Sequence, residues 1–201
     1  MNNRPISWEH TLAIWVSAIS NPVLVVALSL VYLTNRFATD IDDVLKYSAT
    51  GLSLIVIGPA LVYILLRWRH DRKIDVDVTN RADRPLPLLV ASIGALLGGT
   101  LISNRFDIPS LLFISQTLVM MLLVLTVVTT VWKISIHTST LSALITLLVV
   151  LRGPELAFLY VLLVPVAWAR VLLRKHSVSQ IIGGTLLGIA VTYFCWLALG
   201  R

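Results

Sequence analysis

The chain has 201 residues, of which 57% are hydrophobic and only 13% are charged, and its mean hydropathy is +0.89. About 25% of the residues in a soluble domain are charged, so these values exclude an ordinary soluble fold. The formal net charge of +6 comes from cations that lie between apolar runs, without the aromatic-interleaved basic segment that follows a nucleic acid strand. We therefore expect a membrane-embedded chain that binds no nucleic acid.

Seven apolar runs approach the roughly 20 residues that a helix needs to cross a bilayer. The fifth run is short, and it either forms a stubby helix or joins the sixth across Gly153-Pro154, where a turn is the favoured outcome. The sequence predicts an all-α, polytopic bundle of six to seven transmembrane helices, with residues 1–201 forming one integral membrane domain. The runs lie near residues 11–33, 48–66, 86–103, 109–132, 138–151, 156–173 and 179–199.

Several glycines fall within the third and seventh runs. Because glycine has no side chain, it lets membrane helices approach closely. We expect such contacts at Gly94, Gly98, Gly183, Gly184 and Gly188.

The predicted number of spans places several polar segments that are distant in sequence on the same membrane face. With seven spans, the connections after the second, fourth and sixth lie on the same side as the N-terminus. His137 and His176 each open a span on that side, and Arg84 and Arg170 lie in the same connections. We therefore expect these segments to converge in space.

The residue types in these segments suit phosphoryl transfer. Arginine presents a planar fork to phosphate oxygens, and two histidines can divide nucleophilic attack from protonation of the leaving group. Either histidine alone is more often a packed interfacial residue than a catalyst. The remaining cations near these segments are better explained as residues that flank spans: Arg67, Arg69, Arg174 and Lys175.

Arg170 is followed after five residues by His176 and after three more by Gln180. This spacing resembles the third motif of the type 2 phosphatidic acid phosphatase superfamily, which reads Ser-Arg, five residues, His, three residues, Asp. Here Ala169 stands at the serine position and Gln180 at the aspartate position. The resemblance implies that Gln180 orients His176 by a hydrogen bond without supplying a negative charge.

The two other motifs of that superfamily match in part. Residues 134–137, Ile-Ser-Ile-His, correspond to Pro-Ser-Gly-His and share its serine and histidine. Residues 84–85 match the Arg-Pro of the first motif, in which six residues separate an initial lysine from this arginine. That lysine position falls on Asp77, and the nearest cations are Lys73 and Arg81.

The resemblance covers residues 73–188 and implies a phosphatase-like catalytic core. It implies a membrane-embedded phosphatase that hydrolyses a lipid phosphate or diphosphate, of prenyl or phosphatidic acid type, without a cofactor. His176 would attack phosphorus to form a phosphohistidine, and His137 would protonate the departing lipid oxygen and later activate water. The phosphate-binding residues would be Arg84, Arg170, Arg81, Lys73 and Ser135.

Two acidic residues leave a metal alternative open. Asp75 and Asp77 either pair with nearby arginines or bind a magnesium ion that bridges a diphosphate, since that ion prefers oxygen ligands and usually needs the substrate phosphates as well. We favour pairing and expect no resident metal.

Two rival functions also remain. A binding or transport protein for phosphate lipids could keep the fold without turnover, and the altered aspartate and lysine positions favour it. A purely structural subunit is the third reading, but ionisable groups in a membrane are functional by default.

The cations are distributed unevenly between the two sides. Eleven of the sixteen Lys and Arg residues lie on the N-terminal side, so the positive-inside rule places that side and the site in the cytoplasm. Without the four cations assigned to phosphate, seven remain against five. The short loops indicate that a lipid with a small phosphate head enters laterally from the bilayer, so the expected partners are that lipid and the bilayer. The sequence indicates no oligomeric state.

Overall fold

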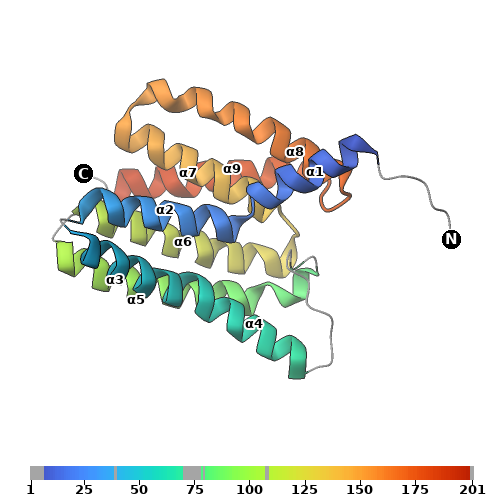
Figure 1. The fold of residues 1–201 in the computed structure, drawn as a ribbon. Helices are drawn as coiled ribbons and strands as arrows, with labels where there is room; N and C mark the ends of the chain where they lie inside the picture. The colour runs from blue at the N-terminus through green and yellow to red at the C-terminus, as the bar shows by residue number, and fades with distance from the viewer. Residues whose placement is uncertain (1–6, 39, 70–77, 79, 107–108, 200–201) are drawn as a thin grey trace. The chain divides into compact units, whose positions relative to one another are not determined.

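The structure, a computed structural model, describes residues 7–38, 40–69, 78, 80–106 and 109–199. Every regular element in these ranges is helical (Figure 1), which confirms the predicted all-α class. The elements are α1 (Trp8–Ile19), α2 (Pro22–Phe37), α3 (Ile41–Leu52), the π-helix η1 (Ser53–Ile57), α4 (Gly58–Arg69), the 3-10 helix η2 (Arg81–Asp83), α5 (Pro85–Phe106), α6 (Pro109–Val131), α7 (Ile136–Arg152), the 3-10 helix η3 (Pro154–Leu162), α8 (Leu163–Leu172) and α9 (Val178–Leu199).

Long apolar helices make this chain a multi-pass integral membrane protein. Five stretches of the described chain are long and apolar enough to cross a bilayer, and α1 with α2 makes a sixth if the pair counts as one span. A helix pairs its backbone N–H and C=O groups internally, and this is necessary because the hydrocarbon core of a bilayer offers no hydrogen-bond partners. The five stretches are Ile41–Arg69, Arg81–Arg105, Leu112–Val131, Pro154–Leu172 and Val178–Leu199.

The structure interrupts the first predicted run and decides between the two alternatives left open for the fifth run. The first run is interrupted because Pro22 cannot continue the hydrogen bonding of α1, and the Asn21 side chain instead caps α2 by accepting a hydrogen bond from Val23 N at 2.9 Å. The fifth run forms α7, which at 17 residues is shorter than a full span. It does not join the sixth run, since Gly153 has a φ of 135° and ends it.

The chain packs as two compact units. Unit 1 comprises Met1–Val25 and Ile134–Ala190, and unit 2 comprises Val26–Lys133 and Val191–Arg201. Within unit 2, α5 packs against α6, α4 and η1. A Cβ atom at Gly94 of α5 would collide with the Leu54 carbonyl of η1, so this close contact requires glycine, as predicted.

Hydroxyl side chains join α7 to the first half of α9 within unit 1. Thr138 Oγ1 donates to the Ile181 carbonyl at 3.2 Å, and Ser142 Oγ donates to the Thr185 carbonyl at 3.0 Å. The members of each pair advance by four residues, which is about one turn of each helix. The two helices therefore cross with their backbones unusually close.

Glycines on α9 permit this approach. A Cβ atom at Gly184 would lie 2.5 Å from the Ser135 carbonyl oxygen, and one at Gly188 would collide with the Ser139 carbonyl. Both positions thus bear out the predicted packing role. At Gly98, by contrast, a Cβ atom would meet its neighbours at an ordinary 3.6 Å.

Candidate functional site

The turn that ends α8 brings His176 back to Arg170. The Arg170 carbonyl accepts hydrogen bonds from Lys175 N at 3.0 Å and from His176 N at 3.3 Å, and Arg174 N donates to the Val171 carbonyl at 2.9 Å. Arg174 has a φ of 52°, the left-handed conformation that commonly ends a helix. The five-residue spacing between Arg170 and His176 is therefore the length of one helix-ending turn.

The Arg170 side chain is buried, with 1% of its surface exposed. Its Nη1 donates a hydrogen bond to Ser17 Oγ of α1 at 2.7 Å. A buried charge is costly unless polar groups surround it, and a membrane protein carries such a group at a functional site by default. The burial of Arg170 thus distinguishes it from an exposed cation that flanks a span.

Gln180 holds the His176 imidazole, which is also buried. Gln180 Oε1 lies 3.1 Å from His176 Nδ1 and accepts a second hydrogen bond from Ser177 N at 3.3 Å. Ser177 Oγ in turn accepts a hydrogen bond from Gln180 N at 3.3 Å. Ser177 and Gln180 thereby form the reciprocal capping box that starts many helices, here at the beginning of α9.

This arrangement fixes the tautomer of neutral His176. The Ser177 N–H can only donate, so the oxygen of the Gln180 amide has to face it. The same oxygen faces Nδ1, which must therefore carry the proton and donate it. In a neutral imidazole the other nitrogen, Nε2, then holds the lone pair, which is the requirement for a nucleophile.

The segment that carries His137 is tied to the segment that carries His176. Ser135 N donates a hydrogen bond to the Gln180 carbonyl at 3.1 Å. Ser135 begins α7 as its N-cap, and its Oγ accepts a hydrogen bond from Thr138 N at 3.4 Å. His137 follows as the second residue of α7 and is 4% exposed. The hydroxyl predicted to bind phosphate is thus engaged in capping a helix.

Unit 2 contains the described part of the first motif. Arg84 is 2% exposed, and its Nε donates to the Val78 carbonyl at 2.8 Å. Arg81 is exposed and donates to the Val131 carbonyl at the end of α6. Asp83 pairs with Arg67 at 2.6 Å. Arg84 is therefore the buried arginine of the pair, and Arg81 caps a helix.

The remaining predicted residues of this motif, Lys73, Asp75 and Asp77, lie outside the described residues. Within the described ranges, no group of three or more His, Cys, Asp or Glu side chains is arranged to hold a metal ion.

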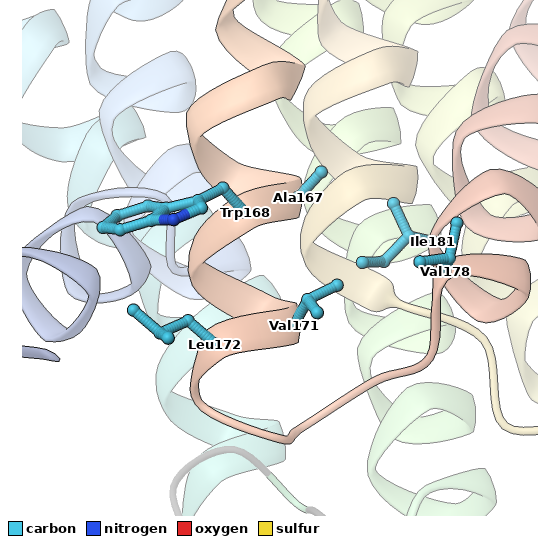
Figure 2. A pocket seen from close by; sticks show the side chains of 6 residues that line it. All are labelled: Ala167, Trp168, Val171, Leu172, Val178 and Ile181. Carbon is cyan, nitrogen blue, oxygen red and sulfur yellow. The ribbon is translucent and has the colours of Figure 1, made fainter. Parts of the chain in front are cut away.

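An apolar groove of about 340 Å³ lies beside the same turn in unit 1 (Figure 2). It is formed by the end of α8 and the start of α9, so its lining residues lie on both sides of Arg170 in the sequence and shortly after His176. Hydrocarbon is the chemistry that such walls accept. The lining residues are Ala167, Trp168, Val171, Leu172, Val178 and Ile181.

Two residues of this region are absent from the sequence prediction. Ser177 carried a readable signal, since Ser-x-x-Gln before an apolar run is a capping-box pattern. Ser17 carried none, because its partner Arg170 lies 153 residues away. Only the packing of the helices reveals that contact.

The family described as the PAP2 superfamily matches residues 60–201. No curated protein and no solved structure matches the chain. Since the family match covers well over half of the sequence, the chain belongs to the PAP2 superfamily, and the predicted family membership is confirmed. Members of this superfamily are generally phosphatases that act on phosphate-containing substrates. The match begins in α4 and leaves α1 to α3 outside it.

Proposed function

We propose that this member of the PAP2 superfamily hydrolyses a membrane lipid phosphate or diphosphate through a phosphohistidine intermediate, with His176 as the nucleophile. The observation that carries the proposal is the hydrogen bond between His176 Nδ1 and Gln180 Oε1, 3.1 Å long. It leaves the lone pair of the neutral imidazole on Nε2. Gln180 occupies the position of the orienting aspartate in the third motif, so a neutral amide takes over the aiming role.

The reaction follows two displacements at phosphorus. In the first, His176 Nε2 forms a bond to phosphorus, the bond from phosphorus to the lipid oxygen breaks, and His137 donates a proton to that oxygen. In the second, a water oxygen attacks phosphorus, His137 accepts the proton of the water, and the phosphorus–nitrogen bond breaks. Both histidines return to their starting states, as covalent and acid–base catalysis requires.

Arg170 supplies the positive charge for the transferring group. Charge in the transition state spreads over the equatorial phosphoryl oxygens, and a cation fixed beforehand in a water-poor site stabilises it more than a mobile one would. Arg84 keeps its predicted phosphate-binding role, as do Lys73, Arg81 and Ser135. Of these, Arg81 and Ser135 are the weaker candidates because each already caps a helix.

A lipid is the substrate class that the surroundings of this turn support. The apolar groove can take a hydrocarbon chain while its phosphate lies at the polar turn. Prenyl phosphates, prenyl diphosphates and phosphatidic acid all have a small phosphate head on such a chain. The proposal also includes a cytoplasmic location for this turn, because most of the Lys and Arg residues are predicted on that side. Labelling of an Asn2→Cys variant in intact cells tests the location. Reaction of the thiol with a reagent that cannot enter the cell would contradict it.

Phosphate release tests the function. The purified full-length chain is given a prenyl phosphate, a prenyl diphosphate and phosphatidic acid in mixed micelles, and released phosphate is measured. We expect release from at least one of them, abolished in His176→Ala and retained in His10→Ala, an exposed histidine of α1. Absence of release with all three lipids, or equal release by His176→Ala, would contradict the proposal.

The rival function is binding or transport of a phosphate lipid without turnover. The uncharged Gln180 favours it, because an amide stabilises the imidazolium of a phosphohistidine less than a carboxylate does. The two functions differ in one product. A phosphatase leaves an acid-labile phosphoryl group on wild-type protein quenched during turnover, whereas a binding protein leaves none and binds lipid equally well as His176→Ala.

A further inference from the structure

A serine of α1 holds the buried arginine of α8. Arg170 Nη1 donates to Ser17 Oγ at 2.7 Å, and Ser17 is itself only 8% exposed. Helices α1 and α8 pack against each other within unit 1 (Figure 1). This contact joins the third motif to a helix that lies outside residues 60–201, the part matched by the family.

The sequence of α1 explains why Ser17 faces α8. The buried residues of α1 are Ala13 and Ser17, which are four residues apart and therefore lie on one face. Both are small and allow a close approach, whereas Trp8 and Trp15 are exposed. The buried face of α1 thus presents one hydroxyl group, at the position of Arg170.

Ser20, the C-cap of α1, makes a different hydrogen bond from Ser17. Ser20 is also 8% exposed, and its Oγ donates to the Val16 carbonyl of α1 at 2.8 Å. Bonding to the carbonyl four residues earlier is the usual arrangement for a helical serine. Ser17 Oγ instead accepts a hydrogen bond from the guanidinium of another helix.

We propose that Ser17 is a positioning residue for Arg170, which makes α1 a working part of the phosphate site. The inference rests on the proposed role of Arg170 in binding phosphate. A guanidinium has five N–H donors in one plane, so anchoring Nη1 on Ser17 sets the direction of that plane. The long side chain then loses its rotamer freedom on folding rather than when phosphate arrives.

Substitutions in α1 test this role in the full-length chain. Ser17→Ala removes the acceptor, Ser17→Thr keeps a hydroxyl, and Ser20→Ala is the matched control of equal burial. Phosphate release from phosphatidic acid gives kcat/KM, and calorimetry gives the Kd of inorganic phosphate. We expect Ser17→Ala to lower kcat/KM about tenfold, the size of one hydrogen bond to a charged group. Ser17→Thr should recover most of that loss, and Ser20→Ala should match the wild type.

A double-substitution cycle separates positioning from general destabilisation. If Ser17 acts through the Arg170 fork, Ser17→Ala should cost nothing further in an Arg170→Lys background, since the two residues form one coupled pair. An equal loss in both backgrounds would overturn the inference. So would a Ser17→Ala variant with the kcat/KM of Ser20→Ala.

The two proposals fail in distinguishable ways. Wild-type turnover with no effect of Ser17→Ala refutes the role of Ser17 alone. Phosphate binding without turnover refutes the phosphatase function, and the Kd of Ser17→Ala for phosphate then decides the role of Ser17. A wild-type protein that neither binds nor releases phosphate refutes both.

Discussion

The amide oxygen of Gln180 accepts hydrogen bonds from the imidazole of His176 and from the backbone of Ser177, at 3.1 Å and 3.3 Å. The capping box that starts α9 and the group that aims His176 are therefore the same side chain. A carboxylate at this position would add negative charge to the imidazole, and the amide supplies only direction. The two contributions can be separated by substitution.

Gln180→Ala should lower kcat by roughly a hundredfold, because loss of the aiming hydrogen bond lets the nucleophile turn away from phosphorus. Steady-state phosphate release measures the effect. Ser179→Ala, at a neighbouring exposed position of α9, is the control and should keep the wild-type kcat. Wild-type turnover by Gln180→Ala would rule out the aiming role.

Gln180→Glu should increase the amount of phosphohistidine trapped during turnover. Glutamate preserves the capping box and adds a negative charge beside Nδ1, which favours the imidazolium form of the phosphorylated ring. Rapid quenching with a radiolabelled lipid phosphate measures the acid-labile phosphoryl group on the protein. An unchanged or lower level would mean that charge at this position does not control the intermediate.

Contacts between residues that are close in sequence could be predicted at this site, whereas contacts between residues far apart in sequence could not. Arg170, His176 and Gln180 are linked by one turn and one capping box, and the resemblance to the third motif implied the contact between Gln180 and His176. The break before Pro22 was also readable, since Asn-Pro favours a turn, although a continuous apolar run concealed it. The contacts of Ser17 with Arg170 and of Arg81 with Val131 span 153 and 50 residues. They depend on which helices pack together, and no short pattern encodes that.

A matched pair of glycine substitutions tests the close crossing of α7 and α9. Gly188→Ala should destabilise the protein by about 1–3 kcal/mol, because its Cβ meets backbone that cannot move freely. Gly98→Ala should be neutral or slightly stabilising, since alanine favours helix over glycine by about 1 kcal/mol and its Cβ has room. Denaturant titration of both variants in detergent measures the difference, and equal stability would contradict the crossing.

Arg84→Lys should lower kcat/KM more than Arg81→Lys does. Arg84 is buried, whereas Arg81 is exposed and caps α6. Lysine keeps the charge but loses the planar fork that binds two phosphate oxygens at once. Phosphate release by the two variants measures the order, and a larger loss in Arg81→Lys would reverse the assignment of the first-motif arginine.

Filling the apolar groove should discriminate between long and short lipid chains. Val171 lines the groove (Figure 2), so Val171→Trp would occupy space that a hydrocarbon chain needs. We expect a higher KM for a long-chain phosphatidic acid and little change for a dioctanoyl form, whose chains reach less far along the groove. Val164→Trp is the control, because Val164 is a 65% exposed residue of the same helix that does not line the groove. If Val171→Trp changed KM equally for both lipids, the effect would come from the phosphate site and not from the groove. If Val171→Trp and Val164→Trp had equal effects, the groove would have no role in substrate binding.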